Sequence, residues 1–296
     1  MPLTSELVDT EVGRISVVCD ARWLMAYAAG IPDERTDLFD TTTTLVPHPM
    51  FPVAPEWALL ASHRAAPSTM TRNELSRGVH AAHDIIHERS IVPGETIDIT
   101  ARVVAVGRRD AGATQTTLFE ATDADGRSVW RTKFLTLFRG VELDGDPVSA
   151  ELNWPQLPRQ PAQPNGSVNS PEPIAVRTSH VRSIDAHIYT ECARIWNPIH
   201  TDLAIARAAG LDAPILHGTA TLARAVSIVT ELTSPRLADI GRVSAAFTSM
   251  IPFPSSMVIR VLATDDHSTH FDVVDESGHR AIKNGTVERF RDSAAR

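Results

Sequence analysis

A proline-rich segment in the middle of the chain constrains the fold more than any other feature of the sequence. Six prolines lie between Glu151 and Pro173, together with Gly166 and several polar residues. Proline fixes φ and removes a backbone donor, so this stretch is typical of an extended connector and not of a core element. We therefore expect a lobe over residues 1–150, a linker over 151–173 and a second lobe over 174–296, each lobe of about the size of a common domain.

The two halves carry a similar order of predicted elements. Each half opens with a short helix, at 21–30 and 184–195, and continues with an apolar helix, at 56–62 and 219–232. Alternating apolar and polar residues then predict strands: 95–103, 114–122 and 129–138 in the first half, and 256–264, 269–274 and 280–289 in the second. An Asp/Gly turn signal, at 123–126 and again at 275–278, predicts a hairpin in each half.

This order predicts an α+β fold in which a curved antiparallel sheet wraps one helix in each lobe. Two such lobes could pair edge to edge, which would give one continuous sheet and remove two exposed edges. The match between the halves is one of pattern and not of identity, so two unrelated α+β domains are the alternative.

Composition excludes several function classes. The chain has 28 basic and 36 acidic residues and a net charge of −8, which argues against a nucleic-acid-binding surface. No run of eighteen apolar residues predicts a membrane helix, and residues 1–14 lack the layout of a signal peptide. Two cysteines are too few for a disulfide framework. We expect no nucleic-acid or membrane partner and a cytoplasmic location.

The segment Asn197-Pro198-Ile199-His200 is the most informative for function. A helix cannot continue past Pro198, because the residue before a proline is disfavoured in the α region. Asp202 is placed to cap the next helix, over 203–209. His200 is therefore expected on a short rigid corner between two helices, where its side chain can point into a cleft.

A second chemical element follows at the start of the long apolar helix. Gly218 lies near the N-terminus of that helix, where backbone N–H groups are free and the helix dipole favours negative charge. Glycine also lets a ligand approach the backbone closely. A histidine and such an oxyanion site are the two parts needed to polarise a carbonyl and move a proton beside it.

These residues resemble the MaoC-like family of (R)-specific enoyl-CoA hydratases and hydroxyacyl-thioester dehydratases. The family pattern is Asp-x-Asn-Pro-x-His, a helix, and then Pro-x-x-His-Gly at the start of the central helix. The matching residues are Asn197, Pro198, His200, Pro214, His217 and Gly218. The resemblance covers residues 180–290, and it implies a double hot-dog fold with a degenerate N-terminal lobe.

The resemblance also implies roles for individual residues. His200 would be a general acid/base, the Gly218 amide would bind the thioester oxygen, and Asn197 would brace the corner loop. We expect His217 to brace the loop as well. The segment Pro49-Met50-Phe51-Pro52 would help line the acyl tunnel. The substrate would be an acyl thioester of CoA or of a carrier protein, in fatty acid or polyketide metabolism, with no cofactor.

One position departs from the family pattern, because Ile195 stands where the family has its catalytic Asp. Another carboxylate could replace it, and Asp202 and Glu191 are the nearby ones, although the first is more typical of a helix cap and the second of a solvated helix face. Alternatively, His200 could dehydrate an activated β-hydroxyacyl thioester alone. In a third case the lobe binds acyl groups without turnover.

The leading hypothesis is a hydro-lyase, with a non-catalytic acyl-thioester binding or partner subunit as the alternative and an acyl-CoA thioesterase as the second alternative. The spacing of His80, His83 and His87 would place them on one helical face. Zinc sites usually add a cysteine or carboxylate, so we predict no metal site. Association into a homodimer is left open by the sequence.

Overall fold

The computed structural model describes residues 2–65, 70–158 and 172–290, so most of the predicted linker, 159–171, lies outside the described residues. Within these ranges eleven strands form one sheet in which every strand pair is antiparallel, in the order β2-β4-β5-β6-β3-β10-β13-β12-β11-β9 with β8 beside β4. A small parallel pair, β1 (Leu3–Thr4) and β7 (Leu143–Asp144), lies apart from it.

The first lobe contributes five long strands and three helices. They are β2 (Glu11–Val18), β3 (Gly78–His87), β4 (Thr96–Arg109), β5 (Gly112–Asp123), β6 (Ser128–Arg139), α1 (Ala21–Gly30), α2 (Val53–Ala65) and α3 (Arg72–Ser76). The short strand β8 (Val148–Ser149) follows.

The second lobe repeats this composition. Its elements are β9 (Ala175–Val181), α4 (Asp185–Ala193), α5 (Leu203–Ala208), α6 (Gly218–Thr233), β10 (Ile240–Phe247), β11 (Ser255–Thr264), β12 (Ser268–Asp275) and β13 (Arg280–Arg289). The predicted helices and strands of both halves are confirmed, with ends that shift by a few residues; the largest shifts are at β4, which continues to Arg109, and at α2, which begins at Val53.

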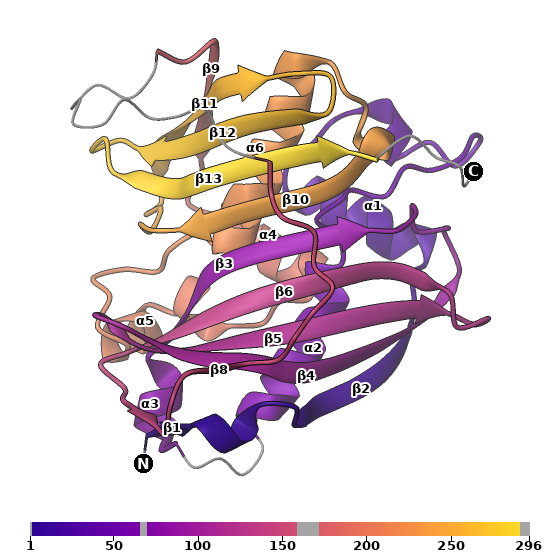
Figure 1. Cartoon of the computed structure of the whole chain (residues 1–296). Coiled ribbons are helices and arrows are strands. Elements are labelled where there is room, and N and C mark those ends of the chain that lie inside the picture. Colours follow the sequence, from indigo (N-terminus) through magenta and orange to yellow (C-terminus); the bar gives the residue numbers. More distant parts are fainter. Residues whose placement is uncertain (1, 66–69, 159–171, 291–296) are drawn as a thin grey trace.

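The two lobes join edge to edge, as expected, through strands β3 and β10. Val243 of β10 lies opposite Ile85 of β3, and the pairing runs over five residue pairs. In Figure 1 the sheet is continuous across this junction, and the helices lie together on one side of it. The helical spacing considered for His80, His83 and His87 is wrong, since all three lie on β3, where His83, Ile85 and His87 are buried with the two-residue period of a strand.

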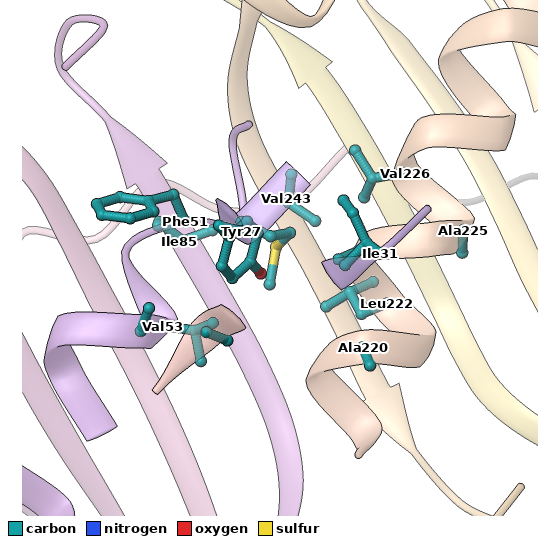
Figure 2. Close-up of a cluster of buried hydrophobic side chains, with 14 of the residues drawn as sticks. Tyr27, Ile31, Phe51, Val53, Ile85, Ala220, Leu222, Ala225, Val226 and Val243 are labelled. Atoms are coloured by element: carbon teal, nitrogen blue, oxygen red, sulfur yellow. The ribbon is translucent and has the colours of Figure 1, made fainter. Parts of the chain in front are cut away.

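The lobes also share one hydrophobic core. Figure 2 shows Tyr27, Phe51 and Ile85 of the first lobe beside Leu222, Val226 and Val243 of the second. Helix α6 is buried on almost every side, so it carries an apolar and small-residue sequence over most of its length. The hydroxyl groups of Tyr27 and Tyr189 lie 3.3 Å apart where α1 packs against α4. At this junction the two lobes therefore pack around one common core.

The opposite face of the junction carries a buried ion-pair network. Arg242 on β10 donates to the carboxylate of Asp84 on β3, at 2.7 and 2.8 Å, and to Glu288 on β13 at 3.2 Å. The described part of the linker crosses over this network: the Trp154 indole donates to Asp84, and Arg242 donates to the Pro155 carbonyl oxygen. Figure 1 shows the chain after β8, up to residue 158, running over this face of the sheet.

Replacing Arg242 with Met should destabilise the whole protein. The side chain is 6% exposed, and its loss leaves the carboxylates of Asp84 and Glu288 close together with little access to water. We expect the free energy of unfolding in urea to fall by about 3–5 kcal/mol, as for other broken buried ion pairs. The matched control is Arg236→Met, which removes an exposed pair with Asp239 and should leave the free energy of unfolding almost unchanged. Equal losses in the two variants would contradict this account.

Candidate active site

The corner predicted around His200 is present. Helix α4 ends at Ala193, and Pro198–His200 form one turn of 3₁₀ helix. The Asp202 carboxylate accepts hydrogen bonds from the amides of Ala204 and Ile205, at 2.8 and 3.1 Å, and so caps α5. The local chemistry of proline and of the Asp cap thus holds His200 between two helices, as the sequence indicated.

The His200 ring is buried and its orientation is fixed. Its Nδ1 lies 2.8 Å from the carbonyl oxygen of Ile215, which can only accept, so Nδ1 carries the proton. Burial lowers the pKa of His200 to about 4. At neutral pH the ring is therefore uncharged, and Nε2 is left as the unprotonated nitrogen.

His217 packs directly on this ring. The two imidazole rings are stacked, with centroids 3.7 Å apart. His217 Nε2 lies 3.2 Å from the Thr190 hydroxyl, so the residue connects the start of α6 to α4. Burial is the main reason that the pKa of His217 lies well below its usual value, and the neighbouring His200 lowers it further. These contacts place His217 as a support for the corner.

Gly218 is the first residue of α6. The hydrogen-bond ladder of the helix begins with the Thr221 amide, which donates to the His217 carbonyl at 3.0 Å, so the amides of residues 218–220 precede it. A Cβ atom at Gly218 would lie only 3.2 Å from Cδ1 of Phe247, a ring that also lines the cavity described next. The glycine therefore keeps the helix start open to a ligand.

His200 and Gly218 line the same cavity, which has a volume of about 150 Å³. Ile195, Asn197 and His217 line it as well, so most of the motif converges there. Another part of the wall comes from the first lobe. It consists of Val53, Glu56, Trp57 and Leu60 of α2, Gly78, Val79 and His80 of β3, and Phe134 of β6. The cavity thus lies at the junction between the lobes.

The structure places the segment Pro49-Met50-Phe51-Pro52 elsewhere. Met50 and Phe51 are fully buried in the shared core, and none of the four residues lines this cavity. The reason is that α2 begins at Val53, which turns the preceding residues under the helix, where the Phe51 ring packs edge-on to Trp23 and Tyr27. The wall predicted for this segment is formed instead by the next turns of α2.

The two carboxylates considered as replacements for the missing Asp also lie outside the cavity. Asp202 is exposed and occupied as the cap of α5. Glu191 is exposed and accepts a 3.3 Å hydrogen bond from the Trp196 indole. Ile195 itself is 4% exposed and faces the cavity, so the family's carboxylate position is occupied by an apolar side chain. Pro198 shapes the corner but does not line the cavity.

A carboxyl group that the sequence reading missed does line the cavity. Glu56 on α2 is fully buried, and burial raises its pKa to about 8. The available signal was a single acidic residue within the apolar stretch 53–61. The sequence predicts Glu56 as the first residue of a helix, whereas α2 begins three residues earlier and turns Glu56 inwards.

Within residues 2–65, 70–158 and 172–290, no group of three or more His, Cys, Asp or Glu side chains is arranged to hold a metal ion. None of the helices in the described part of the chain is long and apolar enough to cross a membrane. The His87 ring bonds the Pro49 carbonyl oxygen at 2.8 Å, and His80 stacks on Phe134.

Several solved structures share the fold of this chain. A MaoC-like dehydratase from Phytophthora capsici aligns over 98% of both chains, with 19% identity and a TM-score of 0.80. The full-length peroxisomal multifunctional enzyme type 2 of Drosophila melanogaster aligns over 93% of this chain and 48% of its own, with 20% identity and a TM-score of 0.72. A Mycobacterium tuberculosis protein described as having a double hot-dog fold covers 95% of this chain and 97% of its own, with 11% identity and a TM-score of 0.60.

These likenesses establish the fold. No curated protein matches the sequence. The family model described as "MaoC like domain" matches residues 162–284, the part of the chain that contains the corner and the helix start. The chain therefore has a double hot-dog fold, and its residues 162–284 match the MaoC-like domain model.

Proposed function

We propose that this protein interconverts β-hydroxyacyl and α,β-unsaturated acyl thioesters, with His200 as the base and the Gly218 amide as the site for the thioester oxygen. The observation that carries the proposal is that both groups line one small cavity. Membership of the MaoC-like domain family supports the reaction class. The acyl carrier would be CoA or a carrier protein, and no cofactor is required.

The chemistry follows from what the two groups can supply. A carbonyl oxygen at the start of α6 would meet free amides and the positive end of the helix dipole, which stabilise negative charge on that oxygen. The proton on the neighbouring α-carbon then becomes easier to remove. The unprotonated Nε2 of His200 is the acceptor for it, since Nδ1 is occupied by Ile215.

The position of Ile195 favours a second candidate, which is acyl-thioester binding without turnover. In that case calorimetry with an acyl-CoA would register binding, no product would form, and Ile195→Asp would create turnover where the native protein has none. Our proposal predicts measurable turnover by the native protein. A thioesterase would instead release a free thiol, which a thiol reagent detects.

His200→Ala should reduce turnover by about 10²–10⁴-fold, because the variant lacks the acceptor for the α-proton. The assay follows the absorbance of the conjugated double bond of crotonyl-CoA and of longer enoyl-CoAs. The matched control is His267→Ala, which removes an exposed histidine and should leave the rate unchanged. A native-like rate in His200→Ala would remove this residue from the mechanism, and no turnover of any enoyl-CoA by the native protein would contradict the proposed reaction.

The His200 ring should stay neutral well below its ordinary pKa of 6.5, with a midpoint near 4, because protonation would place a charge in a buried site. Since this folded-state pKa is lowered, the ring's contribution to stability is complete above pH 6.5 and is lost as the pH falls through the folded value. The measurement is NMR of ¹⁵N-labelled histidine, with the His200 signals assigned by their loss in His200→Ala. Near neutral pH we expect the proton on Nδ1, and a proton on Nε2 would leave no acceptor for the α-proton. A midpoint at the ordinary value would contradict the burial of the ring.

A further inference from the structure

Glu56 has no role in the reaction as described so far, although it lines the same cavity as His200 and Gly218. It belongs to the first lobe, on α2, whereas the other two groups belong to the second. Among the described residues that line the cavity, Glu56 is the only acidic one and none is Lys or Arg. The Glu56 carboxyl group therefore has no cation to pair with among the residues that line this cavity.

The two carboxyl oxygens of Glu56 differ in their surroundings. Oε1 accepts hydrogen bonds from the Trp130 indole at 2.9 Å and from the Thr132 hydroxyl at 2.6 Å. Oε2 is buried and has no hydrogen-bond partner in the described structure. Leaving a buried polar oxygen unpaired is costly, so such groups in native proteins call for an explanation.

The protonation state of Glu56 follows from this environment. Burial without a cation raises its pKa to about 8, so the group carries a proton at neutral pH. Because Oε1 already accepts two hydrogen bonds, the proton belongs on Oε2. The cavity then holds an uncharged acid from one lobe and an uncharged base, His200, from the other.

We propose that Glu56 is the general acid of this site and protonates the β-hydroxyl group of the substrate as it leaves. This inference rests on the function proposed above. It gives Glu56 the place of the carboxylate that the family pattern would put at residue 195. The residue would reach the β-carbon from α2 of the first lobe, while His200 and Gly218 of the second lobe hold the thioester end.

The proposed step balances in atoms and electrons. His200 Nε2 takes the α-proton, and the C–H electron pair forms an enolate whose oxygen lies at the start of α6. That pair then forms the Cα=Cβ bond as the Cβ–O bond breaks, and the departing hydroxyl takes the Glu56 proton and leaves as water. Proton transfer from the His200 imidazolium to the Glu56 carboxylate, through water, restores both groups. Hydration is the reverse.

Other titratable residues line the same cavity, and a test must distinguish their effect on activity from that of Glu56. They are His80 on β3, His200 on the corner and His217 at the start of α6. His217 is engaged with Thr190 and stacked on His200, and His80 is stacked on Phe134 at 3.7 Å. None of these is a carboxylic acid, so an isosteric amide at position 56 tests Glu56 alone.

The test compares two substrates in Glu56→Gln. This variant preserves an oxygen that can accept from Trp130 and Thr132 but cannot donate a carboxylic acid proton. Dehydration of 3-hydroxybutyryl-CoA should fall by about 10²–10⁴-fold. Elimination of chloride from 3-chlorobutyryl-CoA should be largely retained, because chloride leaves without being protonated and still needs only His200 and the amide.

The matched control is Glu191→Gln, which makes the same chemical change at an exposed carboxylate and should not change the rate with either substrate. His200→Ala should lose activity on both the hydroxyl and the chloride substrate. Equal losses of activity on the two substrates in Glu56→Gln would mean that Glu56 has only a structural role. An unchanged rate with the hydroxyl substrate would also overturn the inference. If the native protein eliminates from neither substrate, the proposed function fails and not merely the role of Glu56.

Discussion

The pairing of β3 with β10 is the constraint on which the rest of the structure depends. It joins the six strands of the first half and the five of the second into one sheet, and it brings the helices of both lobes against a common core. The Arg242 network fixes the same junction from the other face. Because the cavity has one wall from each lobe, the site exists only when this junction is formed.

Burial at the junction sets the chemistry of the site. The same loss of water lowers the pKa of His200 and raises that of Glu56, since each is disfavoured in its charged form. An uncharged base and an uncharged acid can coexist in a site without forming an ion pair. Pairs of groups whose surroundings push their pKa values apart in this way are a common basis for assigning acid and base roles.

Much of the fold could be predicted from local sequence because local chemistry determines it. The helix over residues 21–30 begins at the Asp20 cap, and the strand hairpins show regular alternation around Asp/Gly turns. The two junction strands were missed for a physical reason. β10 is buried over its first six residues, and two of the buried positions of β3 are histidines, His83 and His87, so neither strand shows an alternation of apolar and polar residues.

The site also contains residues that could be predicted from local sequence and one that could not. The corner at Pro198 and Asp202, with the helix start at Gly218, follows from residues close in sequence, so the motif could be located. Glu56 could not, because its partners Trp130 and Thr132 are 74 and 76 residues away and its cavity is shared with another lobe. The tunnel role expected for Met50 and Phe51 failed because the point at which α2 begins decides which side chains turn inwards.

A crystal structure with butyryl-CoA bound would test the central claim most directly. Butyryl-CoA has no leaving group, so it can occupy the site without reacting. We predict that its thioester oxygen lies about 3 Å from the Gly218 amide nitrogen, with the α-carbon beside His200 Nε2 and the β-carbon towards Glu56. An acyl chain that lies outside the junction cavity, or a thioester oxygen turned away from the start of α6, would contradict the account.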